Sequence, residues 1–530
     1  MCCCMAVFLL GVIVLNADAA LPERTLVYCS EGSPSGFDPG QTQSGVEYSA
    51  SAETIYDRLV KLNLDTLRIQ PSLATDWDIS PDGRVYTFHL RRDVKFHTTP
   101  WFKPTRAFNA QDVLFTFERM LNPKMPFRTA YPTEFPYVHF TGIDTLIQNI
   151  EAPDPYTVRF TLKKANAPFL ANLAIPPASI LSAEYAANLL KADRPSDIDR
   201  KPVGTGPFFL KEYVQDAFIR FDGNPEYWKP NDVQVSQLLF AITPDAAVRA
   251  QKLKANECQI SVYPRPADVA ALKADPHLRV LSRPGFTFSY LAYNVTHKPL
   301  DDVQVRRALD MAIDKKAIIN AVYAGHAQVA VAPMAPVQWS YDSTLKDTPR
   351  DLERAKALLA KAGYPNGLSL SLWAMPIQRF YNPNPRLMAE MIQADWKKIG
   401  VKAKIVTYEW GEYLKRSKRG EHDAMLIGGI SDNGDPDNWL GTTLSCHAVG
   451  SANYAQWCNP AFDDLIQKAV QTTDVAQRSQ LYIQAQKLFK REQPFTPIAY
   501  PTIYQPINRN VTGFKIHPFG LTVFHGVGLK

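Results

Sequence analysis

The sequence predicts an α/β protein built as two lobes around a cleft, with an extra α/β domain inserted in the first lobe. Its 530 residues are too many for one hydrophobic core, so several domains are expected. Residues 367–440 alternate between strand and helix patterns, which is typical of a parallel sheet. Strand-like segments near the C-terminus would return to the first domain, and such a path implies two lobes.

Two breaks mark the expected domain boundaries. Val203–Phe208 (VGTGPF) is interpreted as a crossing back to the first domain, and Pro284-Gly285 precedes another α/β region. The predicted division is a signal peptide over 1–20, domain I over 21–46, 203–284 and 504–530, domain II (the insertion) over 47–202, and domain III (the second lobe) over 285–503.

Periodicity and capping residues place the elements of domains I and II. Val85–Leu90 alternates as a strand does, and Asn109 stands where it can cap a helix. The expected strands are 26–29, 85–90, 94–97, 157–162, 209–213, 218–221 and 235–242, and the expected helices are 48–60, 111–121, 181–191 and 244–254.

Residues 367–440 of domain III carry the clearest pattern. It predicts strand 368–374, helix 385–400, strand 401–410, helix 411–418 and strand 424–428, followed by a polar turn over 431–438. Because such crossovers are right-handed, the three strands should lie parallel in one sheet. Around them we expect strand 288–294, helices 303–312, 315–323, 351–362, 460–470 and 474–491, and strand-like segments 497–503 and 512–519.

Composition and charge are those of an ordinary globular protein. The formal net charge is +6 and the Lys and Arg residues are scattered. The basic run Lys415–Arg419 is better explained as a solvated helix face than as a nucleic-acid site, so no nucleic-acid partner is expected.

The first 20 residues resemble an export signal, with an apolar Met5–Leu15 and small residues at Ala17–Ala20, although no Lys or Arg precedes them. Removing them leaves Cys29, Cys258, Cys446 and Cys458. In an exported protein four cysteines suggest two disulfides with three possible connectivities. Cys446 and Cys458 flank a short loop and are the natural pair, while buried free thiols are the alternative.

Catalytic and metal-binding signatures are absent from the sequence. Gly32–Gly36 fails the serine-hydrolase pattern because Pro34 occupies the nucleophile position. The turn starting at Asp432 fails the calcium-loop rule because Gly434 and Pro436 fall at ligand positions. We therefore expect no catalytic residue, no metal site and no cofactor.

Arg379 and Asp432 lie in loops that follow two of the predicted parallel strands. In open α/β sheets that edge binds ligands, and a cation with an acid there suits a small zwitterion. Tyr381 and Trp410 fall at the same edge and would wall a pocket. The alternatives are a surface arginine, a plain acidic turn and, for Trp410, core packing.

Several long stretches resemble the peptide and nickel solute-binding family of ABC importers. They include TLVYCSEGSPSGFDP (25–39), VYTFHLRRDVKFH (85–97), NAQDVLFTFERM (109–120), ANECQI (255–260), the run 389–416 and SDNGDPDNWL (431–440). The resemblance spans nearly all of residues 25–530. It implies a bilobal periplasmic-binding-protein-like fold, no catalysis, and disulfides Cys29–Cys258 and Cys446–Cys458.

In dipeptide-binding members of that family the residue at Asp432 pairs with the ligand ammonium and the one at Arg379 with its carboxylate. The expected ligand-binding set is Arg379, Asp432, Tyr381, Trp410, Gly45, Ser44 and Asn433. Phe380 departs from the family pattern, which usually has proline there. The segment 98–106 (TTPWFKPTR) is closer to the branch linked to antimicrobial-peptide uptake.

The implied mechanism is capture of a dipeptide by hinge closure. The terminal charges of an extended dipeptide lie about 6 Å apart, so the two side chains would act as a ruler. The expected partners are a short peptide and a membrane permease, and the expected setting is the Gram-negative periplasm, as a monomer. Haem or a cationic antimicrobial peptide is the alternative ligand; a hydrolase and a structural surface protein are the other classes considered.

Overall fold

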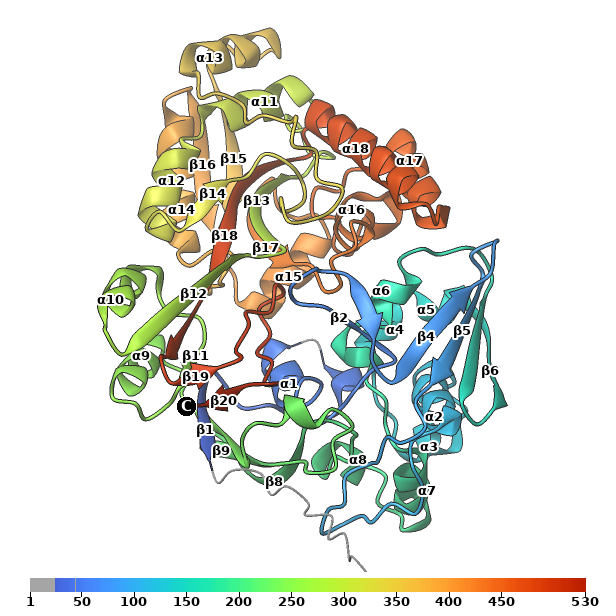
Figure 1. The fold of residues 1–530 in the computed structure, drawn as a ribbon. Helices are drawn as coiled ribbons and strands as arrows, with labels where there is room; N and C mark the ends of the chain where they lie inside the picture. The colour runs from blue at the N-terminus through green and yellow to red at the C-terminus, as the bar shows by residue number, and fades with distance from the viewer. Residues whose placement is uncertain (1–23, 43) are drawn as a thin grey trace, which may run out of the picture.

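The structure, a computed structural model, describes residues 24–42 and 44–530, so the predicted signal peptide lies outside the described residues. Figure 1 shows two lobes. One contains the N-terminal half of the chain and the C-terminal tail, and the other contains most of residues 287–500. The predicted α/β class and two-lobed fold are confirmed.

A twelve-stranded sheet runs through both lobes in the order β16-β15-β17-β13-β18-β11-β1-β10-β9-β8, with β12 and β14 also pairing with β18. Its strands in the first lobe are β1 (Thr25–Ser30), β8 (Phe208–Val214), β9 (Phe218–Gly223), β10 (Gln237–Ile242), β11 (Ile260–Ser261) and β12 (Leu278–Pro284). Those in the second are β13 (Thr287–Tyr293), β14 (Ala327–Val329), β15 (Leu368–Trp373), β16 (Val401–Val406) and β17 (Ala424–Ile430).

The chain passes between the lobes along strand β18 and through the connection from β12 to β13. β18 (Phe495–Asn508) pairs with β13 through its first residues and with β12 through its later ones. β12 ends at Pro284 and β13 begins at Thr287, so the chain crosses beside β18. This antiparallel ribbon is the structural candidate for a hinge, since few residues join the two bodies.

The second lobe is a sheet covered by helices on both faces. Leu291 and Tyr293 of β13 belong to one apolar cluster, whereas Phe288 and Tyr290 belong to another, as alternation along a strand requires. The first cluster packs under α11 (Val303–Ala312), α12 (Lys315–Tyr323), α13 (Leu352–Lys361) and α14 (Pro385–Lys397); the second under α15 (Trp410–Lys418), α16 (Asp437–Leu444), α17 (Pro460–Gln471) and α18 (Val475–Glu492).

β15 pairs in parallel with β16 and with β17, which confirms the predicted three-stranded parallel unit. Aspartate side chains cap three of the predicted helices. Asp314 accepts from Ala317 N, and Asp351 and Asp474 cap α13 and α18 in the same way.

The first lobe shares one large apolar core, which includes residues of both predicted domains I and II. A four-stranded sheet, β4-β5-β7-β6, lies in the insertion. The other strands of the first lobe are β2 (Val60–Leu62), β3 (Ile69–Pro71), β4 (Ala74–Ile79), β5 (Val85–Leu90), β6 (Ile147–Asp154) and β7 (Thr157–Leu162). Its helices are α1 (Gly45–Ala50), α2 (Ala110–Leu121), α3 (Pro126–Ala130), α4 (Pro136–Thr141), α5 (Ile143–Leu146), α6 (Phe169–Asn172), α7 (Ala183–Lys191) and α8 (Asp197–Arg200), and, after the insertion, α9 (Ala246–Lys254) and α10 (Val269–Ala274). The division into three domains stays a prediction.

The expected helix 48–60 was wrong: α1 ends at Ala50. The backbone beyond it bonds to distant segments instead, because Gly206 N donates to Ile55 O at 2.8 Å and Ile180 N donates to Asp57 O at 2.9 Å. These tertiary hydrogen bonds replace the i to i−4 bonds of a helix.

Two expected strands also failed. Residues 94–97 are not in a ladder, since His97 N donates to Gly204 O and Phe108 N to Val94 O. In the tail, β19 (Val511–Thr512) pairs with β20 (Gly528–Leu529), and residues 513–519 form no strand. The expected polar turn 431–438 is also shorter, because α16 begins at Asp437.

Both expected disulfides are present. Cys29–Cys258 joins β1 to the loop before β11, with Cα atoms 5.8 Å apart, and Cys446–Cys458 closes a short loop with Cα atoms 4.4 Å apart. The first fastens a core strand of the first lobe, and the second fastens the loop between α16 and α17.

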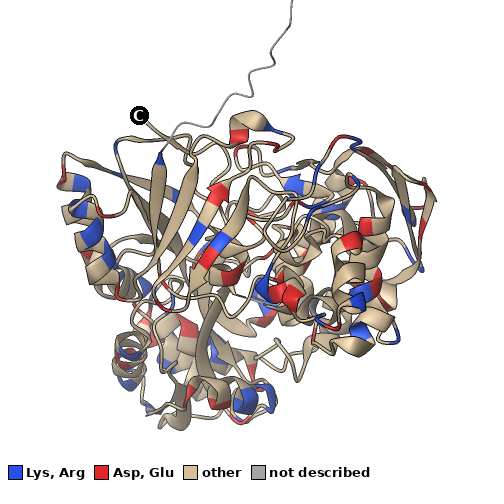
Figure 2. Ribbon diagram, turned by 90° about the horizontal axis from the view of Figure 1, so that it is seen from below, with Lys and Arg blue, Asp and Glu red and all other residues tan. Residues whose placement is uncertain are grey.

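Acidic and basic residues are intermixed over both lobes (Figure 2). This distribution agrees with the scattered charge of the sequence. In the part of the chain that the structure describes, no helix has the length and apolar character needed to span a membrane.

Candidate functional site

Arg379 lies in the loop after β15, held there by reciprocal backbone hydrogen bonds with Asn382. Its side chain is exposed, and its guanidinium carbon lies 4.9 Å from the centre of the Trp410 ring. Among the described residues it forms no ion pair. The guanidinium is therefore fixed from behind by an aromatic face and free to bind an anion.

The aromatic support of Arg379 continues into the core. Trp410 is the first residue of α15, not the last of a strand as expected, and its ring stacks on Tyr413 at 5.7 Å. The Tyr413 hydroxyl donates to Leu426 O in β17 at 2.7 Å. This stack ties the guanidinium to the neighbouring strand of the sheet.

Tyr381 is buried beside β17 and hydrogen-bonds the Arg379 side chain. A Cβ added at Gly428 would lie 2.6 Å from both Tyr381 Cδ2 and Phe288 O. Glycine is therefore required at position 428, near the end of the strand that leads to Asp432.

Asp432 lies in the loop after β17, the strand next to β15. Asn438 shapes this loop, since its Oδ1 accepts from Asp432 N and from Ser431 Oγ, both at 2.9 Å. Burial raises the pKa of the Asp432 carboxyl to about 6, and a side-chain hydrogen bond with Asn438 opposes that rise. Within the described residues Asp432 has no cationic partner.

A buried ion pair between Arg478 and Asp435 anchors the loop that contains Asp432. Arg478 of α18 donates to both oxygens of Asp435, at 3.0 and 2.9 Å, and also to the Tyr482 hydroxyl. Burial, with the charge of Asp435, raises the pKa of Asp437 to about 7, although Arg478 opposes the rise. Arg478 is thus the cation that holds this acidic segment in place.

The first lobe faces Asp432 through α1. Ser44 caps this helix by accepting from Val46 N, and Gly45 is its first residue, where an added Cβ would lie 3.8 Å from Leu521 Cδ2. Tyr48 of α1 has a raised pKa, mainly from burial and then from the charge of Asp432. Tyr48 therefore lies within electrostatic range of Asp432, a proximity that the sequence did not predict.

Asn433 joins the lobes. Its Nδ2 donates to Asn172 Oδ1 of α6 at 2.6 Å, and its Oδ1 accepts from Asp435 N. Nearby, Ala167 N of the first lobe donates to Val470 O of α17 at 2.8 Å. With both ends of its amide engaged, Asn433 holds the lobes together, and its predicted ligand contact stays a prediction.

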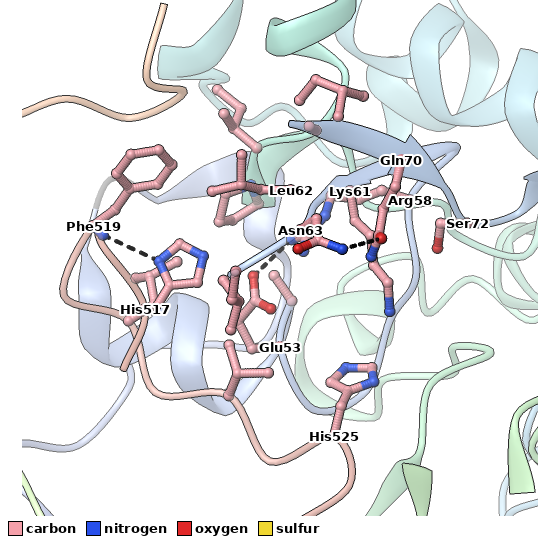
Figure 3. Close-up of a pocket in the computed structure, with 18 of the residues that line it drawn as sticks. Glu53, Arg58, Lys61, Leu62, Asn63, Gln70, Ser72, His517, Phe519 and His525 are labelled. Atoms are coloured by element: carbon pink, nitrogen blue, oxygen red, sulfur yellow. Dashed lines mark hydrogen bonds and ion pairs between the residues drawn. The ribbon is translucent and has the colours of Figure 1, made fainter. Parts of the chain in front are cut away.

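A cavity of about 200 Å³ borders Asp432 and Asn433. Figure 3 shows side chains of its first-lobe wall, among them Glu53, Arg58, His517 and His525. Its first-lobe wall carries charges of both signs, including a Glu53–Arg58 ion pair of 2.8 Å, together with His517 and His525. Burial lowers the pKa of His517 to about 4, so it is neutral at pH 7. A polar space therefore adjoins the acidic end of the site, with room for water.

Arg379 and Asp432 thus lie at the same edge of one parallel unit, with Tyr381 and Trp410 beside the arginine, and neither forms an ion pair with any residue that the structure describes. Ser44 and Gly45 come from the facing lobe. Among the described residues no group of His, Cys, Asp and Glu is arranged to hold a metal ion. The arrangement can hold the two ends of a small zwitterion between the lobes.

Fold and site together define a two-lobed ligand-binding receptor. The chain belongs to the bacterial extracellular solute-binding proteins, family 5, whose model matches residues 68–451. It is 57% identical to di/tripeptide-binding protein 1 of Pseudomonas aeruginosa, over 98% of this chain and 97% of that protein.

Two further relatives differ in the ligand they are named for. A crystal structure of the dipeptide-binding protein of a Pseudoalteromonas species in complex with Met-Leu has a TM-score of 0.84 and 40% identity, covering 96% of this chain and all of that one. Heme-binding protein A of Haemophilus influenzae is 44% identical, over 96% of this chain and 92% of that protein.

Proposed function

We propose that this protein is the receptor of an ABC importer, which captures dipeptides and other short peptides between its lobes and delivers them to a membrane permease. One observation carries the proposal: a guanidinium and a carboxylate that form no ion pair among the described residues follow neighbouring parallel strands, and Asp432 borders a cavity shared with the first lobe. The dipeptide ammonium would pair with Asp432 and its carboxylate with Arg379. Family membership and the named relatives support this ligand class.

We also propose a cellular location and a mode of closure for this receptor. The family is extracellular, and the predicted export signal supports a periplasmic protein in a Gram-negative envelope, acting as a monomer. Closure about the β12–β13 and β18 ribbon would desolvate both ligand ends. Each buried charge then needs its partner, so a peptide too long to place its two ends at Asp432 and Arg379 together would leave one of them unpaired.

Calorimetric titration of the purified protein with a dipeptide such as Ala-Leu tests the proposal. We expect saturable binding with one site, no amino acids released on incubation, and tighter binding than for the single amino acids. Release of free amino acids would indicate a hydrolase. Absence of binding to any dipeptide or tripeptide would reject the proposed function.

Haem is the second candidate ligand, favoured by the relationship to heme-binding protein A. Titration with haem, followed through its Soret band, distinguishes the two. If the protein is a peptide receptor, dipeptide binds without haem and is not displaced by it. A saturable Soret shift without any heat from dipeptides would favour haem instead.

Binding should weaken in acid, because the pKa of Asp432 in the empty protein is about 6. Only the ionised carboxylate pairs with an ammonium, so protons compete with the ligand below that pH. The affinity at pH 5 should be about tenfold lower than its plateau above pH 7, since one pH unit below the pKa leaves about a tenth ionised. Calorimetry between pH 5 and 7.5 measures this, and a flat profile would contradict it.

A further inference from the structure

Glu31 and Tyr263 lie side by side at the edge of the first lobe that carries ligands in such folds. β1 and β11 are neighbouring parallel strands, in which Tyr28 pairs with Ile260 and Cys29 with Ser261. The same register continued beyond the strands sets Glu31 beside Tyr263, at the carboxyl edge of the sheet. Both side chains are half-buried.

Phe380, the residue after Arg379, is a second-lobe residue that contacts Tyr263. Its ring stacks on Tyr263 with centroids 5.8 Å apart and 19° between the ring planes. The Tyr263 hydroxyl donates to Gly520 O at 2.7 Å, which fixes that ring. Glu31, Tyr263 and Phe380 are thus brought together from both lobes, next to the proposed carboxylate anchor.

The carboxylate of Glu31 lacks a strong partner. Within the described residues it forms no ion pair, and the Tyr28 hydroxyl donates to it at 3.4 Å. The neighbouring cation Arg249 makes its hydrogen bonds to backbone carbonyls instead; these belong to Thr243, Pro244, Val262 and Tyr263.

The electrostatic surroundings of Glu31 favour a cation supplied from outside. Burial raises the pKa of Glu31, and the nearby Glu47 adds to that rise, while a hydrogen bond from its own backbone, Arg249 and the Tyr28 hydroxyl oppose it. The raised pKa means that these favourable contacts do not fully offset the cost of burying the charge of Glu31 in the empty protein. An ammonium or guanidinium beside it would supply the missing compensation.

We propose that Glu31, Tyr263 and Phe380 form a subsite for a basic side chain, lysine or arginine, on the second residue of a dipeptide. The inference rests on the proposed function, because Arg379 must hold the carboxylate of that same residue. With the carboxylate at Arg379, the side chain starts next to Phe380. Its methylenes can lie along the two rings while its charged end reaches Glu31.

Other side chains should fit less well. An apolar side chain would pack on the rings but would desolvate the Glu31 carboxylate without giving it a hydrogen-bond partner. An acidic side chain would place a second negative charge beside it. The expected order of affinity is therefore basic, then apolar, then acidic at the second position. A basic first residue should gain nothing from Glu31, since its side chain starts at the Asp432 end.

The test compares Ala-Lys with Ala-norleucine, which has nearly the same chain without the ammonium. In the wild type at pH 7 we expect Ala-Lys to bind about tenfold more tightly, the effect of one good charge pair in a partly buried site. Lys-Ala and norleucine-Ala should bind within about threefold of each other. Calorimetric competition gives all four affinities.

Two variants locate the preference. Glu31→Gln should bring the Ala-Lys to Ala-norleucine ratio close to one, and Phe380→Leu should reduce it in part by removing one ring. Glu212→Gln is the matched control, because Glu212 is an exposed first-lobe acid on β8, paired with Arg220. It should leave the ratio at the wild-type value.

The outcomes separate this inference from the proposed function. Equal binding of Ala-Lys and Ala-norleucine by the wild type overturns the basic subsite while leaving dipeptide binding intact. A preference for Ala-Lys that persists in Glu31→Gln also overturns it. If no dipeptide binds, the proposed function itself fails. Should Glu31→Gln not fold, the wild-type comparison and Phe380→Leu still decide.

Discussion

Asp432→Asn is expected to abolish measurable dipeptide binding while leaving the empty protein folded. Removing one partner of a desolvated charge pair costs about 2–5 kcal/mol, so the affinity should fall at least about thirtyfold. The asparagine keeps the size of the side chain and the loop bonds made through the backbone to Asn438. The loss should therefore reflect the missing charge and not a collapsed loop.

The stability of this variant has a predicted sign. Burial raises the pKa of Asp432 above its ordinary value, so its ionisation disfavours the native state as the pH rises from about 4 through 6. Replacing it by a neutral amide removes that penalty, and the midpoint of unfolding at pH 7 should stay the same or rise. Asp464→Asn is the matched control, since Asp464 is an exposed second-lobe acid paired with Lys468. If Asp432→Asn binds dipeptides as tightly as the wild type does, Asp432 is not the ammonium site.

Arg478→Met is expected to have the largest effect on stability. Arg478 and Asp435 are both nearly fully buried, and the mutation would leave the Asp435 carboxylate without its cation. Breaking such a pair costs about 3–5 kcal/mol of unfolding free energy. Urea unfolding followed by tryptophan fluorescence measures it, and a loss below about 1 kcal/mol would contradict the account.

The double variant Arg478→Met with Asp435→Asn tests whether the unpaired Asp435 carboxylate causes the loss of stability. Asparagine at 435 can still accept the hydrogen bond from Asp437 N at the start of α16. Because it is neutral, removing Arg478 then leaves no buried charge without a partner. The double variant should therefore recover much of the stability lost by the single one. Because this pair supports the Asp432 loop, dipeptide affinity should fall and recover in parallel.

Much of the fold was predictable where local signals agree. The helices 303–312 and 315–323 have the predicted bounds, because an aspartate cap precedes each and their apolar periods are regular. The parallel unit of β15, β16 and β17 followed from alternating strands with helices between them. The disulfides followed from the family resemblance and are present as expected.

The failures share a physical cause. The segment after Ala50 looks helical, yet its carbonyls bind amides that lie some 120 to 150 residues further along, at Ile180 and Gly206. No local pattern reports such a competition. Strand β11 is only two residues long, so the register that sets Glu31 beside Tyr263 could not be read from the sequence.

The candidate site divides in the same way. Arg379 and Asp432 could be named as candidates because each follows a recognisable strand of one parallel unit, and their ligand contacts stay predictions. Tyr48, Asn172 and Phe380 act across the cleft, and their partners come from distant parts of the chain. Asn433 illustrates the limit: its motif was clear, but the sequence could not show that its amide donates to Asn172 of the opposite lobe.

Calorimetry with end-blocked dipeptides tests the central claim most directly. Ala-Leu, N-acetyl-Ala-Leu and Ala-Leu-amide would be titrated into the wild type and into Arg379→Gln. If Asp432 and Arg379 hold the two ends, either block should weaken binding to the wild type at least about thirtyfold. In Arg379→Gln, amidation should make no further difference while acetylation still does. Equal affinity of the free and blocked dipeptides for the wild type would contradict the account.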